Sequence, residues 1–380
     1  MLNETNVTTD WQASSEHRRD LVCLLGLPID VIDLAGAVAK IRAAARKKER
    51  CFISTPNLNF LIHAQRDQAF RDSVLRSDLS VADGVSLLMY ARLIGIKLPG
   101  RVSGADLFAQ LCKTSDGPAL RVFFMGGPPG AAQRASEKVN ADAVGITCVG
   151  HDEGGFGDLE SMSGQPLIDK INAAQPDFVV VALGAAKGQA WIIRNWPRLN
   201  APLIAHLGAV VNFTAGTIRR ALMWMQRSGL EWLWRALTEK GLSERYWNDA
   251  RAMLRVLSRE LLPRLALRLQ PRARPDSAPP SITSTQLEET GVLRLALAGQ
   301  WHQEHRHMLA QAMRLDERAI QSVELNLAQM RGLDIHVLGS LLRAHGRLLE
   351  RGTSGLRLIN VSATVERILR VNEAHYLIQA

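Results

Sequence analysis

Polar side chains follow short apolar runs at several places in the first part of this chain. Thr55 and Asn57 come directly after the apolar run 51–54, and Asp83 comes directly after 80–82. A carboxylate at the end of a strand can accept a proton from a sugar hydroxyl, so Asp83 is a candidate general base. Spacing alone fits an Asp that caps the next helix better, and Thr55 and Asn57 share that ambiguity.

The same pattern continues along the chain. In open α/β sheets, ligands bind at the carboxyl ends of the strands, so we expect the polar residues that follow strands to line one cleft. The further candidates for that cleft are Arg101, Ser103 and Asp106 in RVSGAD, Lys187 and Gln189 after 177–183, and Asn212 after 203–207.

Short apolar runs that alternate with helical spacing must position these residues. This alternation predicts a mostly parallel, Rossmann-like α/β sheet that is covered on both faces. We expect strands over 20–27, 51–54, 80–82, 120–125, 177–183 and 203–207, and helices over 32–47, 59–76, 85–93, 131–140 and around Trp191.

The sequence GGPPGAA follows the strand expected over 120–125 and could cradle a phosphate through its backbone N–H groups. A plain strand-to-helix turn fits this sequence at least as well. The dinucleotide fingerprint also requires an acid about 20 residues further on, and Asp142 comes too soon. We therefore disfavour a nicotinamide enzyme and expect no cofactor.

Residues 219–274 contain 13 Lys and Arg against 5 Asp and Glu, a net charge of +8 out of the chain's +9. They also hold Trp224, Trp232, Trp234 and Trp247. A basic, Trp-bearing, potentially helical segment suits an anionic membrane surface or a phosphate-bearing substrate. A solvated helical hairpin is the simpler alternative, and nucleic acid ranks last because it would leave the strand-end residues without a purpose.

Composition bounds the class of protein. Four widely spaced cysteines indicate neither a disulfide framework nor a zinc site, and the polar N-terminus does not resemble a signal peptide. No apolar run reaches the roughly 18–20 residues of a spanning helix. We expect a cytoplasmic protein, peripheral at the inner face of the membrane.

The expected parts are an α/β domain over 20–218, a basic helical appendage over 219–270, a Pro- and Ser-rich linker over 271–290, and a second domain over 291–380.

Seven stretches in order resemble the WecG/TagA/CpsF family of bacterial glycosyltransferases over about residues 20–247. They are TPNLNFLIHAQRD, SVADGVSLLMYARLIG, RVSGADLF, VFFMGGPPGAA, GAAKGQAWI, HLGAVVNFTAG and WMQRSGLEWLWRA, with RYW downstream. The resemblance implies an inverting, metal-independent transferase that moves a sugar from a UDP-sugar to a polyprenyl-diphosphate-linked saccharide in surface or exopolysaccharide biosynthesis.

The resemblance also implies roles for individual residues. Asp83 would be the general base, with Thr55 and Asn57 beside it and Arg101 in the same pocket. The basic appendage would cover the site, with Arg235 and Arg245 on the diphosphate. No Asp-x-Asp pair that could hold a metal occurs in the chain, which agrees with cations meeting the diphosphate charge.

The chain departs from the family pattern at pocket positions. The usual Pro-Lys-Gln-Glu reads Ala186-Lys187-Gly188-Gln189, the usual acid of the next motif is Asn212, and the Pro after the Arg pair is Leu222. These changes leave the donor open between UDP-N-acetylmannosamine and UDP-glucose types. They also leave an alternative function, a catalytically weakened relative that acts as a scaffold in a polysaccharide-assembly complex.

Residues 291–380 resemble a STAS-type domain. The supporting features are the strand 322–327, a turn with Asp334, the helix 337–351 and the strand sequence LRLINVS. Ile335 occupies the position that is phosphorylated in switch members, so the resemblance implies protein docking, ligand sensing or self-association. His302, His305 and His307 are interpreted as a polar helix start, because no Cys or acid ligands accompany them at suitable spacing.

Overall fold

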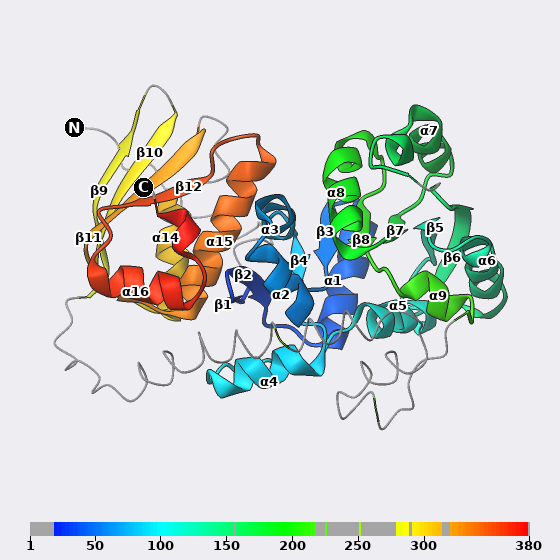
Figure 1. Ribbon diagram of the computed structural model, residues 1–380, viewed down its shortest axis with the longest axis horizontal. Coiled ribbons are helices and arrows are strands. Elements are labelled where there is room, and N and C mark those ends of the chain that lie inside the picture. The colour runs from blue at the N-terminus through cyan, green and yellow to red at the C-terminus, as the bar shows by residue number, and fades with distance from the viewer. Residues whose placement is uncertain are drawn as a thin grey trace. The chain divides into compact units, whose positions relative to one another are not determined.

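A computed structural model describes residues 19–154, 157–217, 225, 251, 279–288, 291–313 and 320–378 (Figure 1). The chain divides into two compact units. The larger unit runs from Leu24 to Arg272 and includes Val371–Glu373, and the smaller unit comprises residues up to Cys23 together with 273–370 and 374–380. The smaller unit therefore combines a short N-terminal segment with the C-terminal part of the chain.

A six-stranded parallel sheet forms the centre of the larger unit, with strand order β4-β3-β8-β7-β5-β6. Its central strands are buried along their whole length and are apolar except for Ser54 and His206 at the ends of β3 and β8, as expected for strands that are covered on both faces. The parallel α/β fold expected from the sequence is confirmed. The strands are β3 Cys51–Ser54, β4 Leu79–Ser80, β5 Leu120–Gly126, β6 Ile146–Asp152, β7 Phe178–Ala182 and β8 Leu203–His206.

Alternate residues of each strand enter two different cores. Ile53 and Phe124 contribute to one core, and Phe52 and Phe123 contribute to the other. Helices cover both faces of the sheet (Figure 1), as the period of two in a strand requires. The helices are α1 Leu34–Lys47, α2 Leu58–Ala64, α3 Gln68–Leu75, α4 Val85–Leu93, α5 Gly104–Lys113, α6 Ala131–Asp142, α7 Gln165–Ala173, α8 Ala185–Asn195 and α9 Val210–Thr214, with short 3₁₀ turns η3 Ser161–Ser163 and η4 Trp196–Arg198.

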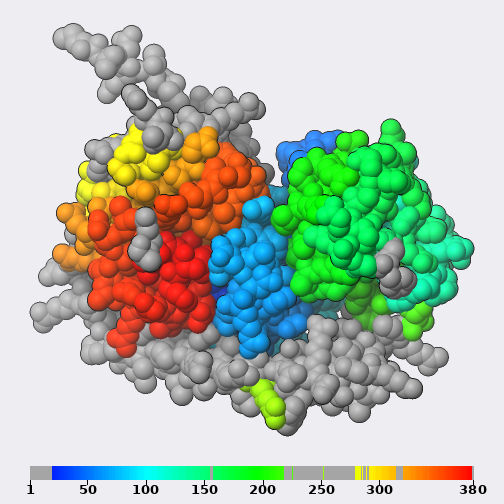
Figure 2. Space-filling view, turned by 45° about the horizontal axis from the view of Figure 1, so that its top comes forward, coloured from blue at the N-terminus to red at the C-terminus, as the bar shows by residue number. Residues whose placement is uncertain are grey.

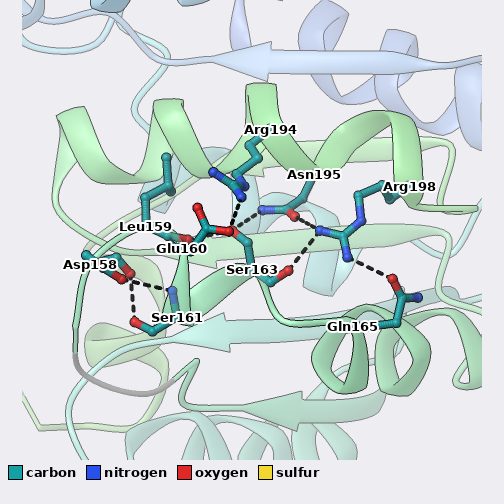
Figure 3. A network of polar contacts seen from close by, with 9 residues as sticks. All are labelled: Asp158, Leu159, Glu160, Ser161, Ser163, Gln165, Arg194, Asn195 and Arg198. Atoms are coloured by element: carbon teal, nitrogen blue, oxygen red, sulfur yellow. Dashed lines mark hydrogen bonds and ion pairs between the residues drawn. The ribbon is translucent and has the colours of Figure 1, made fainter.

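A polar network fixes the C-terminal end of α8 (Figure 3). Asn195 donates to Ser163 Oγ at 2.9 Å, and Arg198 donates to the Ser163 carbonyl and to Asn195 Oδ1, each at 2.8 Å. Arg194 pairs with Glu160 at 2.8 Å. These contacts tie the end of α8 to the segment just before α7. The part of the chain that includes these helices is green in the space-filling view and reaches the surface of the larger unit (Figure 2).

Two predicted elements differ from the structure. Residues 20–27 do not form one strand but two, β1 Leu21–Leu24 and β2 Leu27–Asp30, because Leu25 and Gly26 both have positive φ and reverse the chain. The helix expected over 59–76 divides into α2 and α3, because Asp67 caps a new start by accepting from Phe70 N–H at 3.0 Å. Helix α5, which begins at Gly104 inside RVSGAD, is one of the elements that the sequence did not predict.

The smaller unit contains a four-stranded mixed sheet in the order β12-β11-β10-β9, in which only β9 is antiparallel to its neighbour. Helices α14 Arg306–Met313, α15 Ile335–Glu350 and α16 Ala363–Val371, with 3₁₀ turns η6 Gln303–His305 and η7 His375–Leu377, complete its described part. The strands are β9 Ser281–Leu287, β10 Val292–Trp301, β11 Ser322–Leu333 and β12 Leu356–Ile359.

Strand β9 corrects the linker expected over 271–290. Its sequence SITSTQL contains β-branched Ile282, Thr283 and Thr285, which favour a strand. The many Ser and Pro residues around this segment favoured the prediction of a linker over that of a strand. A strand at the edge of a sheet tolerates such polar residues. The interpretation of the histidines as a polar helix start agrees with the structure for two of them, since His302 and His305 form a capping box at η6.

Candidate functional site

Three loops meet at the carboxyl ends of β3 and β4. The Asp83 N–H donates to the Pro56 carbonyl at 2.8 Å, and the Val102 N–H donates to the Ala82 carbonyl at 2.9 Å. A Cβ placed on Gly104, at the start of α5, would lie only 3.7 Å from Thr55 Oγ1. Residues 55–57, 82–84 and 101–106 therefore form one continuous surface, as expected for residues that follow neighbouring parallel strands.

The structure separates helix caps from other polar residues on this surface. Asn57 caps α2 by accepting from Phe60 N–H at 3.0 Å, and Ser103 caps α5 by accepting from Asp106 N–H at 3.1 Å. The N-cap of α4 is Gly84, with φ +95°, rather than Asp83. Capping therefore accounts for Asn57 but does not account for Asp83.

Arg101 and Asp106 form an ion pair beside these loops. Arg101 donates to Asp106 Oδ2 at 2.7 Å, and Ser103 Oγ donates to the same oxygen at 2.6 Å. Both side chains of the ion pair are partly exposed, so solvent weakens the attraction between them. The pair nevertheless fixes the direction of the Arg101 guanidinium. Among the contacts described, Asp106 thus acts by positioning Arg101.

Gln189 does not lie in an open cleft, in contrast to what its place after β7 suggested. It lies inside α8, is fully buried, and donates from Nε2 to Ser54 Oγ at 3.1 Å. Ser54 Oγ in turn contacts Ser77 Oγ at 2.6 Å. Gln189 therefore links α8 to the end of β3, directly before Thr55. Its place after β7 did not show this, because a helix turns every third or fourth side chain towards the core, and Gln189 is buried with Ile192 on that face of α8.

His206 is a buried residue of the site region that the sequence analysis did not single out. Its Nε2 lies 2.7 Å from the Leu183 carbonyl, which can only accept, so Nε2 carries the proton. Burial lowers the pKa of His206, and the hydrogen bond to Leu183 opposes that effect. Within the described part of the chain, His206 Nδ1 and Gln189 Oε1 are buried without a hydrogen-bond partner. A histidine at the end of an otherwise apolar strand was the available signal.

The remaining predicted residues lie at other strand ends. Asn212 is on α9, where its backbone carbonyl accepts from Thr217 Oγ1 at 3.0 Å, and Lys187 donates to the Gly157 carbonyl at 2.6 Å. In the glycine-rich turn after β5, the Gly130 N–H donates to the Glu153 carboxylate at 2.5 Å. An acid of the chain itself thus occupies one N–H of the turn that could have cradled a phosphate.

Arg235, Arg245 and the rest of the basic appendage lie outside the described residues, apart from single residues at 225 and 251. Within the part of the chain that the structure describes, no three His, Cys, Asp or Glu side chains gather closely enough to hold a metal ion. In the same part, no helix is both long enough and apolar enough to cross a bilayer.

A cavity of about 500 Å³ lies between α5, α6 and α9, and Ala105 is the one residue of the three loops that lines it. Phe108, Val139, Val210 and Phe213 give it apolar walls. It includes none of the predicted site residues. The three converging loops, rather than this cavity, are therefore the candidate site.

The larger unit is an α/β fold with a parallel sheet, and proteins of this class typically bind their ligands at the carboxyl edge, where a carboxylate, an arginine and two capped helix starts lie here. The family model of the "Glycosyl transferase WecG/TagA/CpsF family" matches residues 22–266, and the chain belongs to this family of glycosyltransferases. The matched region contains the whole parallel sheet and the candidate site.

Relatives with curated names agree with this assignment. A protein from Bacillus spizizenii is 30% identical over 210 residues, which cover 55% of this chain and 79% of that protein. Its counterpart from Bacillus subtilis is 28% identical over 209 residues, with 55% and 79% covered, and one from Staphylococcus aureus is 23% identical over 220 residues, with 57% and 85% covered. Each is named N-acetylglucosaminyldiphosphoundecaprenol N-acetyl-beta-D-mannosaminyltransferase.

Proposed function

We propose that this glycosyltransferase moves a sugar from a UDP-sugar, of the UDP-N-acetylmannosamine or UDP-glucose type, to a polyprenyl-diphosphate-linked saccharide. The reaction inverts the anomeric centre, needs no metal, and serves surface or exopolysaccharide synthesis at the inner face of the cytoplasmic membrane. The names of the relatives support an undecaprenyl-diphosphate-linked acceptor and favour N-acetylmannosamine as the sugar.

Asp83 is the general base of the proposed reaction. It takes the proton from the acceptor hydroxyl as that oxygen attacks the anomeric carbon from the face opposite UDP. The bond from the anomeric carbon to the diphosphate oxygen breaks, and UDP leaves with the electron pair. Cations stabilise the charge that develops on the diphosphate, and we assign that task to Arg235 and Arg245, with Arg101 lining the pocket.

One observation carries the assignment of Asp83. Its loop is held between the loop of Pro56 and the loop of Val102 by backbone hydrogen bonds of 2.8 and 2.9 Å. The N-cap of α4 is taken by Gly84, so a capping role does not explain a carboxylate at position 83. Asn57 and Arg101 are partly exposed on the same surface, which supports a substrate-contacting role for both, whereas Thr55 is buried in the same loop as Asn57.

Asp83→Asn tests the proposal. Loss of the base should lower turnover by roughly 10²–10⁴-fold, because this is the usual contribution of general base catalysis. UDP binding should be nearly unchanged, since the substitution keeps the size of the side chain. Turnover is measured as UDP release with membranes that supply the lipid-linked acceptor, and UDP binding is measured by calorimetry.

Asp142→Asn is the matched control, because Asp142 lies on α6 outside the candidate site. It should retain full turnover. Equal turnover of Asp83→Asn and the unaltered protein would contradict the role of Asp83. If the unaltered protein itself released no UDP from any of several UDP-sugars, the scaffold function would replace the enzymatic one.

The remaining parts of the chain extend the same proposal. The basic segment 219–274 would complete the UDP site with its first part and contact the anionic leaflet with its second. The unit that contains residues 291–380 would be a STAS-like domain, a proposal supported by its parallel strands β10–β12 and by Asp334, whose Oδ1 caps α15. This domain would bind a protein partner or a second copy of the chain, which sedimentation of the full chain measures.

A further inference from the structure

Helix α4 exposes two large apolar side chains to solvent. Met89 is 57% exposed and Leu93 is 50% exposed, and they lie one turn apart on the same face of the helix. Leu87, Tyr90 and Ala91 are buried on the other face. Exposed apolar residues that adjoin one another mark a contact surface more often than single ones do.

The charged residues in the segment that contains this apolar pair are all positive. No Asp or Glu occurs from residue 84 to residue 105, and the three charged residues in that stretch are Arg92, Lys97 and Arg101. Arg101 is paired with Asp106, whereas Arg92 and Lys97 are exposed at the surface. Apolar side chains flanked by exposed cations, without acids, match the boundary between the acyl chains and the head groups of an anionic bilayer.

Helix α4 is also continuous with the candidate site. It begins at Val85, two residues after Asp83, and Gly84 makes the turn between them. Figure 1 shows α4 standing apart from the six-stranded sheet, and no other described helix or strand makes an extended contact with it. Any external surface that binds α4 therefore lies close to the loop of Asp83.

We propose that α4 is an interfacial helix that seats the candidate site on an anionic bilayer. Met89 and Leu93 enter the boundary of the acyl chains, and Arg92 and Lys97 contact lipid phosphates. The Asp83 loop then faces the layer in which a lipid-linked acceptor resides. The purpose of this seating rests on the proposed function, but the lipid contact itself does not.

An environment-sensitive fluorophore attached at residue 89 tests the contact directly. Met89→Cys is labelled in a Cys112→Ser background, because the other three cysteines are buried. Vesicles of phosphatidylglycerol and phosphatidylethanolamine, without donor or acceptor, should shift the emission to the blue. The matched control is Val144→Cys, since Val144 is 64% exposed but lies between α6 and β6, and its probe should not respond.

An unchanged probe at residue 89 in protein that floats with the vesicles would overturn the proposal, and so would failure of the protein to float at all. A shift that needs no vesicles and grows with protein concentration would assign the face to a second copy of the chain and overturn the lipid contact.

Substitutions give a second, independent measurement. Met89→Gln with Leu93→Gln should lower the vesicle partition coefficient by roughly tenfold, because two large side chains lose their apolar contact. Arg92→Gln with Lys97→Gln should lower it on anionic vesicles only, and should weaken its dependence on salt. Val144→Gln and Lys138→Gln are the matched controls and should bind like the unaltered protein.

The two proposals fail in different ways. If the double apolar variant partitions like the unaltered protein, the role of α4 is wrong, whatever the effect of Asp83→Asn on turnover. If the probe at residue 89 enters the bilayer but Asp83→Asn turns over normally, only the proposed chemistry of Asp83 is wrong.

Discussion

Residue 188 is glycine because the ring of His206 lies where a side chain would begin. An ideal Cβ at Gly188 would lie 2.2 Å from His206 Cδ2, far inside van der Waals contact. A side chain larger than hydrogen therefore does not fit at residue 188, because the ring of the buried His206 on β8 occupies that space.

Gly188→Ala should lower the free energy of unfolding by about 1–3 kcal/mol, the usual cost of overpacking a core. Elsewhere within a helix the same change stabilises, because glycine is a poor helix former. Denaturant unfolding measures the difference. Gly184→Ala at the start of the same helix is the control, since a Cβ at Gly184 meets nothing within 4 Å.

The interpretation also requires coupling between residues 188 and 206. Gly188→Ala should cost less in a His206→Ala background than in the unaltered protein, because the ring that it meets is gone. Equal costs in the two backgrounds would contradict the contact.

His206 also makes stability depend on pH. Its pKa in the folded protein lies below the ordinary value of 6.5, because burial disfavours the charged ring. As pH falls below 6.5 the unfolded chain takes up a proton that the folded chain does not, so the free energy of unfolding falls. The loss continues until the pH reaches the lowered pKa of the folded state.

His206→Gln should flatten this pH dependence, because glutamine can donate to the Leu183 carbonyl but does not titrate. The measurement is the denaturant midpoint between pH 7.5 and 5, compared for the two proteins at each pH. Only the difference between them reports on His206, since the chain has ten histidines. Parallel curves would show that His206 titrates normally in the folded protein.

At the scale of elements, strand β1 belongs with helix α15 of the smaller unit. An ideal Cβ at Gly339 on α15 would lie 3.0 Å from the backbone carbon of Val22, so the two backbones approach closely. Just before β1, Asp20 Oδ1 accepts from Arg306 at 2.6 Å and from Gln303 at 3.1 Å, and lies 3.2 Å from His336 Nδ1. An apolar contact and a polar cluster together hold the N-terminal segment.

Gly339→Ala should destabilise this packing by about 1–3 kcal/mol, because the obstacle is backbone rather than a flexible side chain. Hydrogen exchange at the amides of residues 21–23 should become faster, which localises the effect to β1. Gly332→Ala on β11 is the matched control, since a Cβ there meets its neighbours at an ordinary 3.8 Å. Unchanged exchange in Gly339→Ala would contradict the close approach.

At the scale of the whole molecule, the compact units do not follow the order of the chain. The domain that we expected to begin at residue 20 loses residues 20–23 to the unit formed by the C-terminal part, and residues 371–373 belong with the larger unit. A deletion at the N-terminus would therefore remove material from the smaller unit. The family match over 22–266 covers most of the larger unit and only residues 22–23 of the smaller one, so the C-terminal part of the smaller unit has no relative-based assignment.

The sequence by itself determined the parallel sheet, because strands that are buried on both faces must be apolar and can therefore be recognised as short apolar runs. It also determined which polar residues follow the strands, so Thr55, Asn57, Asp83 and Arg101 could be named together. The sequence did not show which of these residues cap helices, because Asn57 and Asp83 both lie between a strand and a helix. The structure distinguishes them, because Asn57 accepts from Phe60 N–H at 3.0 Å, whereas the N-cap of α4 is Gly84.

Tertiary structure alone decided the contacts between elements that are distant in the chain. Gln189 meets Ser54 across 135 positions, and Asp20 meets His336 across 316. Local propensity and periodicity report on neighbours within one helix or strand, so they carry no information about such pairs. The pairing of Gly188 with His206 has the same cause, because close packing in three dimensions sets the space that each residue has.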